Sequence, residues 1–266
     1  MKNVLSIAGS DCSGGAGIQA DLKTMCAMGV YGMTAITAVT VQNTRGVYAV
    51  QDIDPDIVAG QIDAVFNDIR VDAVKIGMVS AVPIIRIIRD RLLHHKARNI
   101  VADPVMVSKT KCRLLKEDAE KEILTLMSIA DVVTPNIYEA EVLAGMKIAG
   151  RGDMPAAAAK IHAAGARNVM VKGGLLTDCA DDYLYLDGVG VWLAGDRIDT
   201  NNNQGTGCTL ASAVACGLAK GLGIREACEQ AKAFVRQGIL DALPVGGGVG
   251  PLGHLVEVYR RAGVEV

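Results

Sequence analysis

Gln204-Gly205-Thr206-Gly207-Cys208-Thr209 stands directly before an apolar helical pattern that carries Leu210, Val214 and Leu218. Glycine lets a backbone approach a ligand closely, and the first N–H groups of a helix have no partner within that helix. Those N–H groups and the positive end of the helix dipole together bind anions. The stretch therefore predicts an anion site at a helix start. The alternative interpretation is a structural turn with glycines and a threonine cap.

Two common nucleotide-binding signatures are missing around this predicted site. The chain contains no Gly-Lys-Ser/Thr sequence, so a P-loop is not expected. The dinucleotide fingerprint Gly-x-Gly-x-x-Gly does not follow the first predicted strand either. Both of these nucleotide-binding folds are therefore disfavoured.

Short apolar runs rich in β-branched residues alternate with longer helical patterns along the chain. The runs lie near Val4–Ala8, Met33–Val41, Ala73–Ile76, Asn99–Ala102, Asp131–Thr134 and Val169–Lys172, and the helical patterns near 16–28, 56–69, 81–94, 117–128, 137–144 and 154–164. This order predicts an α/β fold with a mostly parallel sheet and right-handed crossovers.

Asp187-Gly188 lies between two further apolar runs and indicates a β-hairpin. Helical patterns near 205–220, 223–242 and 252–262 follow. Because no linker or repeat interrupts the chain, we expect one domain over residues 1–266.

The overall composition restricts the classes of partner. Half of the 266 residues are apolar, only 3% are aromatic, and the net charge is −2. Nucleic-acid binding is disfavoured without a basic patch or stacking aromatics, although backbone dipoles and one lysine can still bind a small anion. The seven cysteines are scattered without a Cys-x-x-Cys pair, which disfavours a disulfide framework or zinc site and favours a cytoplasmic protein. No apolar stretch is long enough to span a bilayer, so no membrane association is expected.

Polar and glycine residues follow each of the six predicted strands. Ligands bind outside the carboxyl ends of the strands in open parallel sheets, so these residues predict one extended site. They are Gly9-Ser10-Asp11 with Ser13–Gly17, Gln42, Gly77-Met78, Asp103-Pro104, Pro135-Asn136 with Glu139, and Lys172-Gly173-Gly174. Any one of these segments alone also fits a structural loop.

Asp21 lies at the edge of an apolar stripe in the helical pattern at 16–28. Ile18, Leu22 and Met25 occupy the same stripe. A carboxylate that faces inward is costly unless it has a partner. The pattern leaves two interpretations open, a capped or solvated residue at the stripe edge and a residue that contacts a ligand.

Seven motifs occur in an order that resembles one enzyme family nearly end to end. They are Asp11–Asp21, Gln42–Gly46, Lys75–Met78, Asp103–Met106, Thr134–Asn136 with Glu139, Lys172–Gly174 and Gly205–Thr209. Together they are similar to the hydroxymethylpyrimidine/phosphomethylpyrimidine kinases of thiamine biosynthesis. The resemblance implies a ribokinase-like three-layer αβα fold with a small β-hairpin element, ATP with Mg²⁺ as phosphoryl donor, and a homodimer. It also implies successive phosphorylation of 4-amino-5-hydroxymethyl-2-methylpyrimidine to the monophosphate and the diphosphate.

The resemblance implies roles for individual residues as well. Gly9, Asp21, Gln42, Met78 and Val105 resemble the substrate-binding residues. Gly205, Thr206, Gly207 and Cys208 resemble the anion hole under the transferred phosphoryl group, and Lys172 resembles the phosphate-contacting lysine. Asn136, Lys172 and Gly174 resemble nucleotide-binding residues, while Asp103 and Glu139 resemble the residues that organise magnesium. The side-chain chemistry agrees, because the Gln42 amide offers a donor and an acceptor to an aminopyrimidine edge and Asp21 would accept from the amino group.

Cys208 occupies the position where sugar kinases of this fold place a catalytic aspartate. A thiol at a helix N-terminus is expected to have a lowered pKa, so we hypothesise that its thiolate accepts the hydroxymethyl proton in the first step. The second acceptor is a phosphate oxygen that is already largely ionised and needs little or no base. A neutral thiol would also repel the monophosphate less than an aspartate. The alternative is that Cys208 is only a small residue that fits a crowded turn.

Three segments depart from the family pattern. Asn203-Gln204 replaces the usual Thr-His before the anion hole, so the nucleotide contacts there are expected to differ. Lys109-Thr110-Lys111-Cys112 replaces the usual Lys-Ser-Gly-Asp, which puts the contact of that loop with substrate or metal in question. Cys12 replaces a common proline, with a mild effect expected. His94, His95, His162 and His254 have no metal-ligand spacing and are expected at the surface or as caps.

Other activities remain compatible with these residues. Pyridoxal or pyridoxine kinases share this fold, and Gln42 with Met78 favours a pyrimidine without excluding them. A sugar kinase is disfavoured because Cys208 replaces the expected aspartate. A non-catalytic pyrimidine- or nucleotide-binding relative would fit the altered loops, whereas the intact Lys172, Glu139 and Gly205–Cys208 argue against it.

Overall fold

A nine-stranded sheet forms the centre of the structure, a computed structural model that describes residues 1–107, 114–115, 119–176 and 179–265. The strands are β1 (Asn3–Asp11), β2 (Tyr31–Asn43), β3 (Gly46–Asp52), β4 (Ala73–Ile76), β5 (Ile100–Ala102), β6 (Val132–Val133), β7 (Val169–Val171), β8 (Asp182–Leu186) and β9 (Val189–Leu193). Their order is β3-β2-β1-β4-β5-β6-β7-β8-β9. The pairs from β2 to β7 are parallel, and β3, β8 and β9 pair antiparallel at the two sides. The predicted mostly parallel α/β sheet is therefore confirmed.

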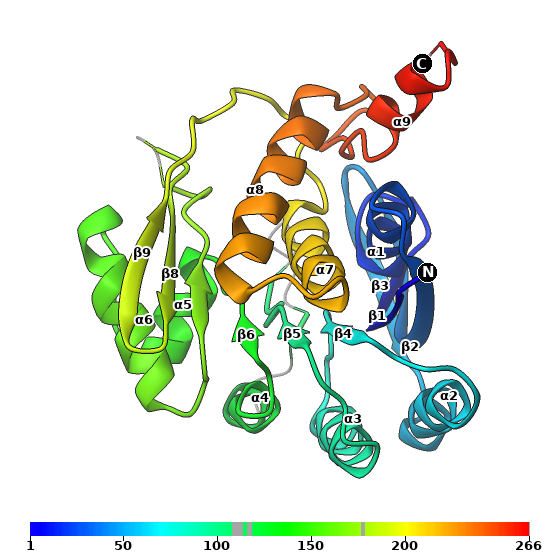
Figure 1. The fold of residues 1–266 in the computed structure, drawn as a ribbon, viewed down its shortest axis with the longest axis vertical. Coiled ribbons are helices and arrows are strands. Elements are labelled where there is room, and N and C mark those ends of the chain that lie inside the picture. Colours follow the sequence, from blue (N-terminus) through cyan, green and yellow to red (C-terminus); the bar gives the residue numbers. More distant parts are fainter. Residues whose placement is uncertain (108–113, 116–118, 177–178, 266) are drawn as a thin grey trace.

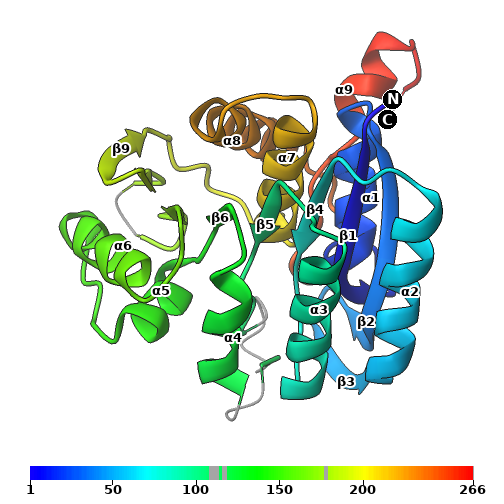
Figure 2. The ribbon, with the colours of Figure 1, turned by 60° about the horizontal axis from the view of Figure 1, so that its bottom comes forward.

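Helices cover both faces of the sheet and make three layers (Figure 1). On one side lie α1 (Gly17–Ala27), α7 (Thr206–Ala219) and α8 (Ile224–Leu240), and on the other lie α2 (Pro55–Asp68), α3 (Val82–His94), α4 (Glu120–Met127) and α6 (Met154–Ala163) (Figure 2). The remaining helical elements are α5 (Ile137–Ala144), the short 3-10 helix η2 (Arg151–Asp153) and α9 (Val256–Arg261). The carboxyl ends of the parallel strands thus meet at one edge between two helix layers.

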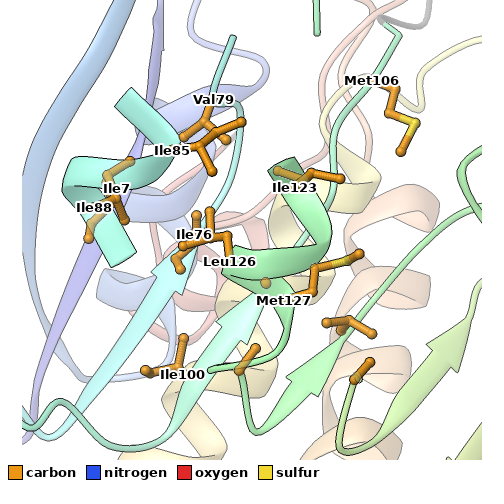
Figure 3. Packing of buried hydrophobic residues seen from close by; sticks show 14 of the residues in the cluster. Ile7, Ile76, Val79, Ile85, Ile88, Ile100, Met106, Ile123, Leu126 and Met127 are labelled. Carbon is orange, nitrogen blue, oxygen red and sulfur yellow. The ribbon is translucent and has the colours of Figure 1, made fainter. Parts of the chain in front are cut away.

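Aliphatic side chains fill both interfaces between the sheet and its helices. On one side, Ile85 and Ile88 of α3 lie in the same buried cluster as Ile7 of β1 and Leu126 of α4 (Figure 3). On the other side, the apolar residues of α7 form a second cluster with Val101 and its neighbours in the sheet. Full burial of one such side chain stabilises the fold by about 1.5–3 kcal/mol. Aromatic side chains contribute little to either cluster, in agreement with the composition.

The structure differs from the predicted elements most clearly at β3 and at the last helix. β3 pairs antiparallel with β2, although no strand was predicted there. Most of its residues are exposed, so this edge strand lacks the alternation that burial of one face imposes. The last helix begins at Val256 rather than near residue 252. The Lys109–Cys112 segment and the first two residues of the helix predicted at 117–128 lie outside the described residues.

None of the helices within the described ranges combines the length and the apolar character needed to cross a bilayer. The strands from both halves of the chain join one sheet. That the chain forms one domain over residues 1–266 stays a prediction, which the continuity of this sheet supports.

Candidate active site

A cavity of about 1270 Å³ opens at the carboxyl ends of the parallel strands. Gly9, Gln42, Met78 and Val105, which we call the acceptor wall, line this cavity. Gly205–Cys208, which we call the anion cradle, line it too. Asp103, Asn136, Glu139, Lys172 and Gly174 complete the set of predicted residues that face it. The structure therefore brings together every predicted site residue except Asp21.

The anion cradle is the start of α7. Gly205 precedes the helix in the left-handed conformation, with a φ of 78° that suits glycine. No side chain caps the first N–H groups of α7, so they can bind an anion. A Cβ atom added to Gly207 would lie 3.2 Å from Asp103 Oδ2 and 3.3 Å from Lys172 Nζ. The cradle therefore lies directly against the lysine and the carboxylate.

Lys172 forms a largely buried ion pair that lines the cavity. Its Nζ lies 2.6 Å from Asp103 Oδ1, and Thr134 Oγ1 donates to the same carboxylate oxygen at 3.3 Å. Burial alone would lower the pKa of Lys172, but the charges of Asp103 and Glu139 outweigh it and raise the pKa above its ordinary value. The lysine is therefore a fixed positive charge next to the cradle at neutral pH.

Glu139 belongs to a capping box at the start of α5. Its Oε2 accepts from the Asn136 N–H at 2.8 Å, and the Asn136 side chain accepts from the Glu139 N–H at 3.0 Å. Burial raises the pKa of Glu139 to about 7, against the opposing charge of Lys172 and with a further contribution from Asp103. The box fixes the Glu139 carboxyl near Asp103, where two carboxyl groups can share a cation.

A family assignment follows from this site together with the sequence. The sequence profile of the phosphomethylpyrimidine kinases matches residues 11–253. The chain belongs to this family. A hydroxymethylpyrimidine/phosphomethylpyrimidine kinase of Rhizobium meliloti (strain 1021) is 50% identical over 255 residues, which cover 94% of this chain and 96% of the relative. The predicted family and the predicted kinase activity are therefore confirmed.

Solved structures of two kinds of kinase share the fold of this family member. A Bacillus subtilis pyridoxal kinase in complex with ADP has a TM-score of 0.90 and 39% identity, over 97% of this chain and 99% of that one. A phosphomethylpyrimidine kinase of Clostridium difficile 630 has a TM-score of 0.80 and 43% identity, over 90% of this chain and 100% of that one. The predicted ribokinase-like fold is confirmed, and both kinds of kinase lie within the same structural neighbourhood.

The pKa of the Cys208 thiol in this kinase differs from the expected value. Burial raises the pKa of Cys208 to about 11, although the charge of Lys75 and a hydrogen bond from the Gly17 backbone oppose the rise. The prediction of a lowered pKa is therefore wrong, because the loss of water outweighs the helix N-terminus. A neutral thiol near pH 7 still fits the argument that Cys208 avoids repulsion of a phosphorylated substrate.

Asp21 was predicted to bind the substrate, but it lies away from the cavity. The side chain is fully buried and does not line the cavity. Lys75 Nζ donates to Asp21 Oδ2 at 2.9 Å, Ser6 Oγ donates to the same oxygen at 2.5 Å, and Ser212 Oγ donates to Oδ1 at 2.7 Å. Protein groups already occupy both carboxylate oxygens, so no ligand amino group is needed as a partner. Lys75 inside an otherwise apolar strand was the sequence signal for this pairing.

His254 is buried, whereas a surface or capping position was expected. Its Nε2 lies 2.8 Å from Thr209 Oγ1, one residue beyond the cradle. Burial, together with the charge of Lys23, lowers the pKa of His254 to about 4. The imidazole is therefore neutral at physiological pH and contacts the first turn of α7 through Thr209.

One contact between predicted segments and one extension of the cavity were not predicted from the sequence. The Asp11 carboxylate accepts from the Gly15 and Ala16 N–H groups at 3.0 and 2.8 Å, and from Gln204 Nε2 at 3.3 Å. Gln204, one of the departures from the family pattern, thus connects the cradle to the turn before α1. The cavity also extends along Asp196–Thr200 and α8, where no motif gave a signal.

Proposed function

We propose that this kinase phosphorylates 4-amino-5-hydroxymethyl-2-methylpyrimidine and then its monophosphate, with ATP as the donor. One observation carries the proposal: the acceptor wall, the anion cradle and Lys172 line the same cavity. A flat heterocycle and a transferring phosphoryl group can therefore occupy one site together. The names of the relatives support the same reaction.

The acceptor wall suits an aminopyrimidine. The Gln42 carboxamide carries both a donor and an acceptor, which match a ring nitrogen beside an exocyclic amino group. Met78 and Val105 supply apolar surface for the ring faces. A Cβ atom on Gly9 would lie 3.2 Å from Met78 Sδ, so the glycine lets the methionine pack closely against β1. With Asp21 buried elsewhere, Gln42 is the residue proposed to recognise the amino group.

Phosphoryl transfer requires mainly positioning and stabilisation of charge, because its transition state is loose. The N–H groups of the cradle and the Lys172 ammonium group would stabilise the charge on the moving phosphoryl group. Asp103 holds Lys172 in place through the 2.6 Å ion pair. The hydroxymethyl oxygen would approach from the side of the acceptor wall.

The carboxyl groups of Asp103 and Glu139 fit a magnesium ion. The described residues contain no group of three or more His, Cys, Asp or Glu that could hold a metal. Magnesium in kinases needs only one or two carboxylates besides water and phosphate oxygens, and Asp103 and Glu139 supply them. The bound ion would neutralise phosphate charge, while these two residues hold it beside Lys172.

Pyridoxal is a second candidate acceptor. The fold matches a pyridoxal kinase in complex with AMP-PCP and pyridoxal from Staphylococcus aureus with a TM-score of 0.88 and 36% identity, over 96% of this chain and 93% of that one. Pyridoxal also has a hydroxymethyl group on a flat ring. It lacks the amino group that Gln42 can recognise, so we expect it to be the poorer acceptor.

Release of ADP with each acceptor tests the proposal. The panel contains the hydroxymethylpyrimidine, its monophosphate, pyridoxal and pyridoxine, with ATP and Mg²⁺, and a reaction without acceptor as the baseline. We expect the highest kcat/KM with the two pyrimidines and formation of the pyrimidine diphosphate. Turnover with pyridoxal alone would replace the proposed acceptor, and no turnover with any acceptor would support a binding protein instead.

We also propose that the kinase forms a homodimer. Val39, Val41 and Tyr48 expose 45%, 57% and 65% of their surface on neighbouring strands at the edge of the sheet. Exposed large apolar side chains at a sheet edge are a feature of protein interfaces, and a second copy would cover them. Light scattering on the wild type and on Val41→Lys tests this, since a monomeric wild type would contradict it.

A further inference from the structure

The turn between β2 and β3 follows Gln42 of the acceptor wall. Thr44 of this turn and the strand residues beside it, Asn43 and Gly46, line the cavity. The pairing of β2 with β3 shifts its register between Val41 and Gln42. Such bulges redirect side chains and are common next to active sites. The direction of the Gln42 side chain therefore depends on how the turn behind it is held.

A glycine-rich segment from the far end of the chain holds this turn. The Gly248 N–H donates to Thr44 Oγ1 at 3.2 Å, and the Val249 N–H donates to the Thr44 carbonyl oxygen at 2.8 Å. A Cβ atom on Gly248 would overlap that carbonyl oxygen, and one on Gly246 would overlap the Thr44 hydroxyl group. Glycine is therefore required for this close approach. We call the contact between Thr44 and Gly246–Val249 the glycine clasp.

Cys12 holds Gln42 on its other side. Its Sγ donates to the Gln42 carbonyl oxygen at 3.1 Å and accepts from the Gln42 N–H at 3.4 Å. The replacement of the common proline by Cys12 was expected to be mild, yet it adds two contacts to a residue of the acceptor wall. The turn before α1 thus contacts the Gln42 backbone directly, and the clasp contacts Thr44, two residues later in the chain.

We propose that Thr44 and Gly246–Gly248 are positioning residues that fix Gln42 and so determine selectivity for the acceptor. The inference rests on the proposed function. An aminopyrimidine uses both the donor and the acceptor of the Gln42 amide, and such paired hydrogen bonds discriminate strongly only when the side chain is held in place. A pyridine ring without the amino group uses fewer of them. A loosened clasp therefore weakens pyrimidine binding more than pyridoxal binding and leaves the nucleotide side unchanged.

Steady-state kinetics of clasp variants test the inference. Gly248→Ala introduces the overlap with Thr44, while Thr44→Val removes the hydroxyl group at nearly constant volume and Thr44→Ser keeps it. Gly152→Ala is the matched control, since no atom lies within 4 Å of an added Cβ there. KM is measured for the hydroxymethylpyrimidine, for pyridoxal and for ATP, together with the melting temperature of each variant.

For Gly248→Ala we expect a rise of about tenfold in the pyrimidine KM, a smaller rise for pyridoxal, and an ATP KM within about twofold of wild type. Thr44→Val is expected to raise the pyrimidine KM more than Thr44→Ser, which keeps the inference testable if Gly248→Ala does not fold. An unchanged pyrimidine KM in both Gly248→Ala and Thr44→Val, or an equal rise for ATP, would overturn it. A wild-type protein without pyrimidine turnover would instead overturn the proposed function, and the inference with it.

Discussion

Lys75 Nζ lies 2.9 Å from Asp21 Oδ2, and both side chains are completely buried. Ser6 and Ser212 donate to the same carboxylate, so β1, β4, α1 and α7 meet at one charged group. Removal of one partner of a buried ion pair leaves an uncompensated charge, whereas replacement of both by apolar residues can be neutral. The pair therefore joins the helix of the anion cradle to the centre of the sheet.

Asp21→Ala is expected to lower the free energy of unfolding by about 3–5 kcal/mol, because the Lys75 charge stays buried without its partner. Urea denaturation measures the change. The double variant Asp21→Leu with Lys75→Met is the matched comparison and should recover most of the loss. A single variant as stable as wild type would contradict the importance of the pair.

Lys172→Met is expected to lower kcat on the order of 10²–10³-fold, as removal of one preorganised donor does in other active sites. The acceptor KM should change far less, because Lys172 is not part of the acceptor wall. Lys160→Met, at an exposed lysine, controls for the loss of a charge elsewhere. A normal kcat in Lys172→Met would exclude its proposed role.

Cys208→Ala is expected to slow both phosphorylation steps by a similar factor, less than about tenfold. Burial keeps the pKa of Cys208 near 11, so little thiolate is present to accept a proton. Separate assays with the hydroxymethylpyrimidine and with its monophosphate measure the two steps. A loss confined to the first step would restore the hypothesis of a thiolate base.

Acidification is expected to destabilise the kinase through His254. The unfolded chain binds a proton at an ordinary histidine pKa of 6.5, but burial holds the pKa of the folded-state imidazole at about 4. Between these values the unfolded state binds more protons, so the free energy of unfolding falls as the pH decreases, by about 3 kcal/mol over the window. Denaturation of wild type and His254→Gln from pH 7 to pH 4 checks this. The exposed His94→Gln is the control and should keep the wild-type dependence.

Strands whose side chains are buried could be predicted from the sequence. The apolar run Ala73–Ile76 is a strand with the same limits in the structure, since all four side chains are buried. β3 was missed because a mostly exposed edge strand carries no such pattern. The convergence of Gln42, Lys172 and Gly205–Cys208 on one cavity could be predicted because strand ends share an edge in parallel sheets.

The environment of individual side chains could not be predicted in the same way. The partner of Asp21 depends on Lys75 and Ser212, which are distant in sequence and near only in the folded protein. The pKa of Cys208 depends on how completely neighbouring segments exclude water, and the helix position alone gives the wrong direction. The clasp joins Thr44 to Gly248 through a close backbone contact. The glycines are its only sign in the sequence, and they do not identify Thr44 as the partner.

The separation of the clasp residues has a consequence for synthesis on the ribosome. Thr44 and Gly248 are 204 positions apart, and Asp11 and Gln204 are 193 apart. A nascent chain emerges from its amino terminus and folds as its segments become available. The first β-strands are therefore translated long before the segments that complete their pocket. Every translation product that stops short of Gly248 lacks the clasp, so the support of the Thr44 turn is completed only late in elongation.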